Sequence, residues 1–279
     1  MGKEKITLKL NNGTAIPQIG LGTWQMSPEE AYDSVKFALE NGYIHIDGAR
    51  AYANSEASGR AWKDSGVKRE DIWITTKIRA EIKDYEGAKE EIENELASFQ
   101  TDYLDLVLIH CPQPWAEYKA NGEGNRYFKE NLEVWKAMVE AYEAGKIKAL
   151  GVSNFHPVDL ENIINNSDVK PVVNQISYRI GYTQDNYVEA AEANDVLIEA
   201  YSPLGTGKIL NNDDIKKIAD KYSKSVAQVA IQYCLQKGHI VLPKSVTPKY
   251  ILENIELDFE LSAEDLDYLD SLDTKQFSQ

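Results

Sequence analysis

The chain has 279 residues, of which 43% are hydrophobic and 27% charged, and its formal net charge is −15 at pH 7. This length suits one large α/β barrel, a fold that often takes about 200–250 residues or more. The acidic excess argues against a surface that binds nucleic acid or anionic membranes, and no stretch approaches the ~20 consecutive apolar residues of a membrane-spanning helix.

Cysteine usage and the first residues favour an intracellular protein. Cys111 and Cys234 do not stand in a metal-binding spacing, so we expect free, buried thiols. Residues 1–5 lack the pattern of a secretory signal. We therefore expect a cytoplasmic protein, monomeric or weakly dimeric, with no nucleic-acid or membrane partner.

The first predicted elements are a β-hairpin and a helix. The hairpin covers residues 6–19, and its Asn12-Gly13 step supplies the positive φ angles that a tight turn requires. The segment Ser27-Pro28-Glu29-Glu30 then opens a helix, with the serine as N-cap and the second glutamate closing a capping box. Gly42 is the expected end of this helix.

From there strand and helix patterns alternate along the chain. Strands are predicted at residues 19–24, 43–47, 72–78, 104–110, 147–154, 172–177, 196–202 and 240–245. Amphipathic stretches between them, including 85–96, 132–143, 185–194 and 226–237, have helical periodicity. Eight strand–helix repeats predict an α/β fold, a (β/α)8 TIM barrel with an N-terminal β-hairpin and an extra C-terminal helix over 262–273. We expect residues 1–279 to form a single domain.

Polar residues end, or closely follow, three consecutive predicted strands. They are Asp47 and Tyr52, then Lys77, then His110. Alone, each has an ordinary role as a helix cap, a packed ring, a solvated charge or a structural imidazole. Because the carboxyl ends of parallel strands meet at the ligand-binding end of such folds, their convergence favours a catalytic site.

A lysine beside a phenol would make the phenol a usable acid near neutral pH. The ordinary pKa of tyrosine is about 10, and lowering it by about three units requires roughly 4 kcal/mol. One ammonium at ~4 Å supplies about that much at an effective dielectric constant near 20. We therefore predict that Lys77 acidifies Tyr52 and that Asp47 keeps Lys77 charged. His110 would orient an oxygen that gains negative charge, such as a carbonyl that accepts hydride.

The segments around these residues resemble the aldo-keto reductase family. The similar segments include 43–54 (YIHIDGARAYAN), 74–77 (ITTK), 106–110 (LVLIH), 151–155 (GVSNF), 200–205 (AYSPLG) and 243–246 (PKSV). The likeness covers essentially the whole chain in the family's order. It implies a (β/α)8 barrel that binds NADP(H) and reduces small-molecule aldehydes and ketones to alcohols, with Tyr52 as general acid.

The resemblance also implies binding residues. For the cofactor they are Ser153, Asn154 and Gln175 at the nicotinamide carboxamide, Tyr201 under its ring, Ser202, Leu204 and Gly205 along the pyrophosphate, Lys244, Ser245, Val246 and Tyr250 towards the 2′-phosphate, and Glu253 and Asn254 beside adenine. For the substrate they are Trp24, Tyr52, His110 and Trp115.

Several positions depart from the family pattern, among them Ser177, Arg179 and Ile180 around Tyr178. Tyr250 stands where the family usually has Arg, and a neutral hydroxyl cannot grip a phosphate as a guanidinium does. We therefore expect NADPH to be used with a weaker preference over NADH than usual, so that NADH is also a coenzyme. Gly48 and Ser55 are expected to loosen the loop between Asp47 and Tyr52.

The sequence offers less support for other sites and other functions. No third glycine follows Gly20-Leu21-Gly22, so the Rossmann fingerprint is absent, and no metal-ligand spacing is present. One alternative is a barrel hydrolase, for which Asp47 and Glu56 are the nearby carboxylates. Another is a non-catalytic NADP(H)-binding or structural member of the same fold, against which the intact set of four polar residues argues.

Overall fold

The computed structural model describes residues 6–273, so residues 1–5, on which the expectation about a secretory signal rests, lie outside it. Within this range one sheet has eight parallel strands in the order β10-β9-β8-β7-β6-β5-β4-β3. They are β3 (Leu21–Gly22), β4 (His45–Asp47), β5 (Trp73–Ile78), β6 (Leu106–Ile109), β7 (Leu150–Ser153), β8 (Val173–Ser177), β9 (Leu197–Tyr201) and β10 (Ile240–Leu242).

Backbone hydrogen bonds bring the two edges of this sheet together. Gly20 N donates to Val241 O at 2.9 Å, and Val241 N donates to Gln18 O at 2.8 Å. Ile19 and Val241 also form a parallel bridge. The first and last strands therefore meet, and the predicted (β/α)8 barrel is confirmed.

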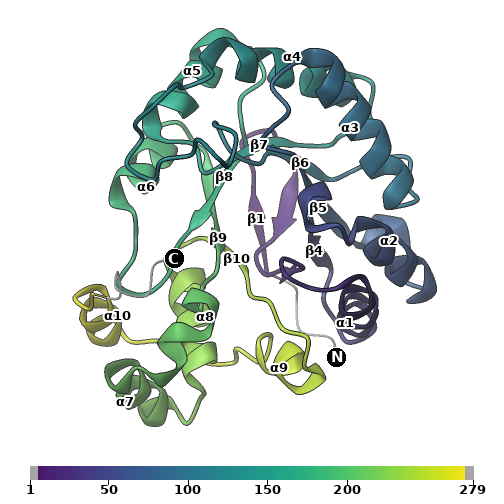
Figure 1. The fold of residues 1–279 in the computed structure, drawn as a ribbon. Helices are drawn as coiled ribbons and strands as arrows, with labels where there is room; N and C mark the ends of the chain where they lie inside the picture. Colours follow the sequence, from purple (N-terminus) through teal and green to yellow (C-terminus); the bar gives the residue numbers. More distant parts are fainter. Residues whose placement is uncertain (1–5, 274–279) are drawn as a thin grey trace.

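Helices surround the strands, as Figure 1 shows. They are α1 (Pro28–Glu40), α2 (Ser55–Asp64), α3 (Tyr85–Ser98), α4 (Phe128–Glu143), α5 (Pro157–Asn166), α6 (Asp185–Glu192), α7 (Asp213–Tyr222), α8 (Val226–Gln236), α9 (Pro248–Glu253) and α10 (Ala263–Asp270), with short 3-10 turns η1 (Arg50–Tyr52), η2 (Arg69–Asp71) and η3 (Gly205–Asn211). In α1 the predicted capping box is confirmed, since Glu30 N donates to Ser27 Oγ at 3.1 Å and Ser27 N to Glu30 Oε2 at 2.8 Å.

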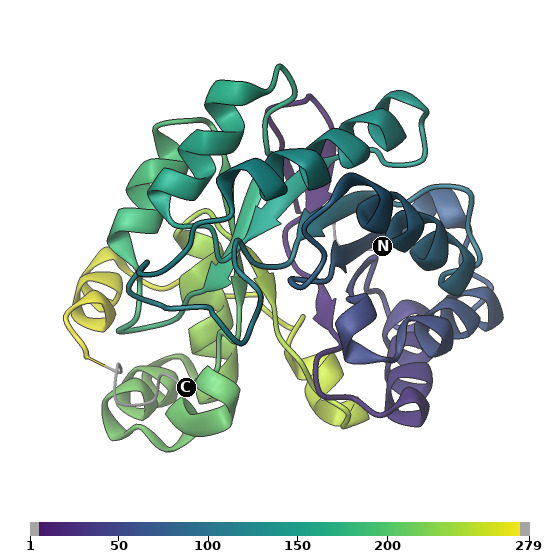
Figure 2. The same ribbon diagram turned by 45° about the horizontal axis from the view of Figure 1, so that its top comes forward.

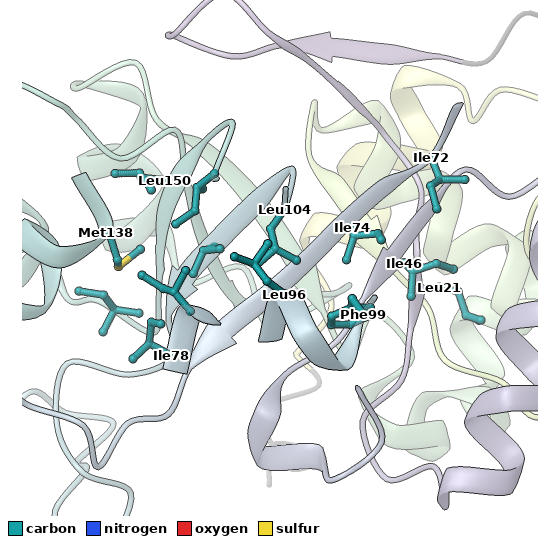
Figure 3. Close-up of a cluster of buried hydrophobic side chains, with 14 of the residues drawn as sticks. Leu21, Ile46, Ile72, Ile74, Ile78, Leu96, Phe99, Leu104, Met138 and Leu150 are labelled. Carbon is teal, nitrogen blue, oxygen red and sulfur yellow. The ribbon is translucent and has the colours of Figure 1, made fainter. Parts of the chain in front are cut away.

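Side chains alternate between two cores along each strand, because successive residues of a strand point to opposite faces. On β4 and β5, Ile46 and Ile74 join the outer cluster between sheet and helices, where they lie near Leu21 and Phe99 (Figure 3). Residues of the opposite parity, such as Asp47, face the barrel interior. This parity decides which polar groups meet inside the barrel.

The N-terminal hairpin closes one end of the barrel. Its strands β1 (Thr7–Lys9) and β2 (Ala15–Pro17) pair antiparallel, as predicted. Leu10 and Ile16 are buried in one cluster with side chains from four barrel strands and with Ala149, which directly precedes β7; the strand residues are Trp73, Leu106, Leu108, Val173 and Ile240. These side chains form an apolar plug, the hairpin plug, that closes this end of the barrel. The polar residues expected to be functional lie at the opposite end.

Some predicted boundaries were wrong. The last strand ends at Leu242 rather than residue 245, because the next residue, Pro243, has no N–H for a sheet ladder. The C-terminal helix α10 ends at Asp270, not 273. Across residues 6–273, no helix has the length and apolar character to cross a membrane.

Candidate active site

A buried ion pair lies at the carboxyl ends of β4 and β5. Lys77 is 0% exposed, and its Nζ donates to Asp47 Oδ1 at 2.7 Å and to Gly48 O at 2.8 Å. Burial, the largest single effect, would lower the pKa of Lys77, but Asp47 together with Tyr52 and Glu199 outweighs it and the pKa rises to about 12. The predicted pairing is confirmed, and Lys77 keeps its positive charge in the interior.

Tyr52 lies beside this pair. It ends the 3-10 turn η1, and Lys77 Nζ is 5.1 Å from the centre of its ring. The connecting loop is tied at two points: Gly48 N donates to Thr75 O at 2.9 Å, and the buried Ser55 Oγ donates to Glu95 Oε2 at 3.0 Å. These contacts argue against the loosening that we expected from Gly48 and Ser55.

The predicted net acidification of Tyr52 is wrong for the protein without cofactor. Burial raises the pKa of Tyr52, and the Lys77 ammonium offsets only part of this rise. The reason is that the same burial that strengthens the attraction of Lys77 also disfavours a phenolate. Tyr52 is therefore protonated at neutral pH.

His110 follows β6 and packs against Tyr52, with ring centroids 5.6 Å apart and the planes at 74°. Burial, and then the charge of Lys77, lower the pKa of His110 to about 3, so the imidazole is neutral. Its Nδ1 is buried and has no hydrogen-bond partner among residues 6–273. The structure thus brings all four predicted polar residues together.

The segment after β6 extends the site. Trp115 stacks edge-on against His110, with centroids 5.2 Å apart, and is 41% exposed. Gln113 is fully buried and anchors the loop, since its Nε2 donates to Glu123 O at 3.0 Å and to Asn125 O at 2.8 Å. This dark teal loop can be followed in Figure 2. Trp24, in contrast, lies in the turn after β3 and is 46% exposed.

The four expected nicotinamide contacts lie on, or directly after, the neighbouring strands β7, β8 and β9. Ser153 Oγ donates to Gln175 O at 2.9 Å, Asn154 Nδ2 donates to Ser153 Oγ at 3.0 Å, and Tyr201 Oη donates to Asn154 Oδ1 at 2.9 Å. Gln175 Nε2 donates to Asp47 Oδ1 at 2.8 Å. These side chains therefore form one network with the buried ion pair.

Left-handed backbone marks the places where the resemblance puts the cofactor. Asn154 has φ 59°, Ser202 has φ 51° and Thr206 has φ 55°, although non-glycine residues rarely adopt such angles. Gly205 has φ 56°, and a Cβ there would lie 3.2 Å from Arg179 Nε. Strained backbone of this kind is common at ligand sites, but seven other non-glycine residues of the described chain also have positive φ, so these angles alone do not identify a cofactor site.

The expected adenosine end is open. Lys244 is exposed and Ser245 half-buried, while Val246 is 37% and Tyr250 53% exposed. Lys249 Nζ lies 3.5 Å from Glu253 Oε1, and Asn254 is buried. Among these residues, the cations that could contact a phosphate are therefore both lysines, Lys244 and Lys249.

Sequence reasoning missed two buried titratable groups beneath the four residues. Glu199 on β9 and His45 on β4 are both 0% exposed, with His45 Nε2 3.7 Å from Glu199 Oε1. Strand parity could have found them, since Glu199 is two residues before Tyr201 and His45 two before Asp47. Gly20 leaves room for the imidazole, because a Cβ there would lie 2.8 Å from the His45 ring.

Two other expectations concern groups outside this network. Glu56, the second carboxylate of the hydrolase alternative, is exposed on α2 and lines a surface pocket with Arg50 and Arg60. Within residues 6–273, no group of three or more His, Cys, Asp or Glu side chains could hold a metal ion. Cys111 and Cys234 are buried and free.

Comparisons with known proteins agree with this geometry. The model of the aldo/keto reductase family matches residues 16–274. A glyoxal reductase of Bacillus subtilis is 40% identical over 270 residues, covering 96% of this chain and 93% of the relative.

Solved structures give the same result. The crystal structure of an aldo/keto reductase from Brucella melitensis has a TM-score of 0.89 and 40% identity, covering 97% of this chain and 100% of that one. A Bombyx mori aldo-keto reductase in complex with NADP has a TM-score of 0.86 and 29% identity, covering 99% and 94%. The chain belongs to the aldo/keto reductase family, and it is an oxidoreductase that acts on carbonyl groups.

Proposed function

We propose that this protein reduces aldehydes and ketones to alcohols with NADPH and uses Tyr52 as the general acid. The observation that carries the proposal is the buried Lys77–Asp47 pair beside Tyr52, at the end of the barrel opposite the hairpin plug. Burying an ammonium next to a phenol costs the hydration of both groups, and buried titratable groups of this kind cluster at functional sites.

The chain supplies a proton, and a bound reduced nicotinamide supplies the hydride. Tyr52 carries its proton at neutral pH, and the Lys77 ammonium offsets part of the rise in pKa that burial causes, so Tyr52 can protonate an oxygen that gains negative charge. Lys77 then stabilises the remaining phenolate, and Asp47 holds Lys77 in place.

His110 is suited to orient the carbonyl. It is neutral, and a proton on its buried Nδ1 would have no acceptor among the described residues. We therefore place the proton on Nε2, since an orphaned N–H costs more than an under-used acceptor. From there it can donate a hydrogen bond to the substrate oxygen.

The cofactor proposal follows the network and the open adenosine end. Ser153, Asn154, Gln175 and Tyr201 would hold the nicotinamide, Ser202, Leu204 and Gly205 the pyrophosphate, Lys244, Ser245, Val246 and Tyr250 the 2′-phosphate side, and Glu253 and Asn254 the adenine. Lys244 gives a point charge but Tyr250 gives none, so we expect NADPH to be preferred only modestly and NADH to be used too.

Small 1,2-dicarbonyl compounds are the proposed substrate class. The support is the relative named as a glyoxal reductase, together with the aromatic wall that Trp115 forms beside His110. A polar carbonyl oxygen would face His110, and the rest of a small substrate would contact the indole.

The test is a matrix of carbonyl substrates and coenzymes with purified full-length protein. Loss of NADPH absorbance with methylglyoxal, glyoxal or an aromatic aldehyde is the expected result, with slower oxidation of NADH. Tight binding of NADPH without turnover of any carbonyl would instead support the non-catalytic alternative.

A further inference from the structure

A second buried carboxyl group shares an amide with Asp47. Glu199 Oε2 accepts a hydrogen bond from Gln175 Nε2 at 2.7 Å, and the same nitrogen donates to Asp47 Oδ1 at 2.8 Å. An amide nitrogen carries two hydrogens. Both hydrogens of Gln175 are therefore committed to carboxyl groups.

This sharing gives the Gln175 side chain a single orientation. A rotated amide would place its oxygen against Asp47, which Lys77 keeps charged, and acceptor would face acceptor. The atom left for the pocket is Oε1, and within the described chain no group donates a hydrogen bond to it. Gln175 thus presents an acceptor.

Charge balance indicates that Glu199 is uncharged. The titratable groups that face it are His45 and Asp47 from β4, Lys77 from β5 and Tyr52 from η1. Burial, and then repulsion from Asp47, raise the pKa of Glu199 to about 8, and burial lowers the pKa of His45 to about 3. Among these facing groups, one cation, Lys77, is then balanced by one anion, Asp47.

We propose that Glu199 is a positioning residue, which as an uncharged acceptor fixes the Gln175 amide and through it the Asp47–Lys77 pair. This rests on the proposed function, because the group that would meet Gln175 Oε1 is the carboxamide NH2 of the nicotinamide. Ionised Glu199 would add a second negative charge beside Asp47 and oppose formation of the Tyr52 phenolate. Glu199 therefore also limits turnover at alkaline pH.

Two variants of the full-length protein separate hydrogen bonding from charge. Glu199→Gln keeps an acceptor and cannot ionise, whereas Glu199→Leu removes the acceptor at similar size. Protein fluorescence gives the dissociation constants of NADPH and of its 3-acetylpyridine analogue, which lacks the carboxamide NH2. Steady-state kinetics with methylglyoxal from pH 6 to 10 gives kcat and KM.

For Glu199→Gln we expect NADPH affinity within about threefold of the parent at pH 7, with the alkaline fall in kcat moved to higher pH. Glu199→Leu should weaken NADPH binding about tenfold, the loss of roughly one well-placed hydrogen bond, and leave binding of the analogue unchanged. The parent should bind the analogue about tenfold more weakly than NADPH.

An unchanged alkaline fall in Glu199→Gln would overturn the proposal, as would parental NADPH affinity in Glu199→Leu. If the leucine variant does not fold, the pH profile of Glu199→Gln and the parent's discrimination between the two cofactors decide alone. Failure of the parent to reduce any carbonyl would refute the proposed function, while the fluorescence titrations would still report on Glu199 and Gln175.

Discussion

At the scale of single residues, Tyr52 is the group whose removal should separate chemistry from binding. Tyr52→Phe keeps the ring against His110 and removes only the phenolic hydroxyl group. We expect turnover to fall by ~10²–10⁴, the usual contribution of a general acid, and the dissociation constant of NADPH to stay the same. Turnover equal to the parent's would refute the role of Tyr52.

Tyr250 should control the choice between NADPH and NADH. It is 53% exposed, next to Lys249, so an arginine can be accommodated there. Tyr250→Arg should lower the KM for NADPH about tenfold, since a charged hydrogen bond to phosphate is worth roughly 1.5–3 kcal/mol, and should spare NADH. Tyr250→Phe is the matched control and should change neither KM.

The opposite change at Lys244 checks the same idea. Lys244→Met removes the remaining point charge and should raise the KM for NADPH, again without affecting NADH. If the two coenzymes respond equally to both substitutions, these residues do not contact the 2′-phosphate.

At the scale of elements, sequence patterns predicted the order of strands and helices and the end of the barrel that carries the polar groups. They did not predict strand ends, because a ladder continues only where two neighbouring backbones overlap. They also missed Glu199, for which the only local signal is its parity with Tyr201 on the same strand, because its partner Gln175 is 24 residues away in the chain. The extent of the single domain, the cytoplasmic location and the monomeric or weakly dimeric state stay predictions.

The hairpin plug should contribute stability without touching the chemistry. Ile16 is 0% exposed among interior barrel side chains, whereas Ile6 in the same segment is 70% exposed. Ile16→Ala should lower the free energy of unfolding by about 2–5 kcal/mol through lost burial and a cavity. Ile6→Ala should change it little.

Urea denaturation of both variants, followed by circular dichroism, measures this difference. The folded Ile16→Ala protein should keep the parent's KM values, because the plug and the site lie at opposite ends of the barrel. A large change in cofactor affinity would contradict that separation.

For the whole molecule, buried titratable groups set the pH of greatest stability. Burial lowers the pKa values of His45, His110 and His239 to about 3, 3 and 4. An unfolded chain would take up protons below about pH 6.5 that the folded chain refuses. These histidines therefore contribute stability above pH 6.5 that is lost as the pH falls towards 4.

Two buried glutamates act in the opposite direction. Burial raises the pKa of Glu95 to about 7 and that of Glu199 to about 8, so the folded chain holds protons that the unfolded chain releases above about pH 4.5. Their contribution is complete below pH 4.5 and is lost as the pH rises through 7 and 8. Between about pH 4.5 and 6.5, stability rises with pH because the three histidines add more than the two glutamates remove. Above about pH 6.5 only the loss from the glutamates remains. We therefore expect maximum stability between about pH 6 and 7.

Thermal unfolding from pH 5 to 8.5 tests this balance. Glu199→Gln should remove the loss of folding stability that ionisation of Glu199 causes at alkaline pH. The thermal unfolding midpoint of this variant should therefore rise relative to that of the parent by several degrees between pH 6.5 and 8.5, corresponding to about 2 kcal/mol. Glu133→Gln, an exposed glutamate on α4, is the control and should follow the parent at every pH. Added salt should leave the Glu199 difference in place, since ions screen the acidic surface far more than a buried carboxyl. A difference that salt abolishes would assign the alkaline loss to repulsion among surface charges instead.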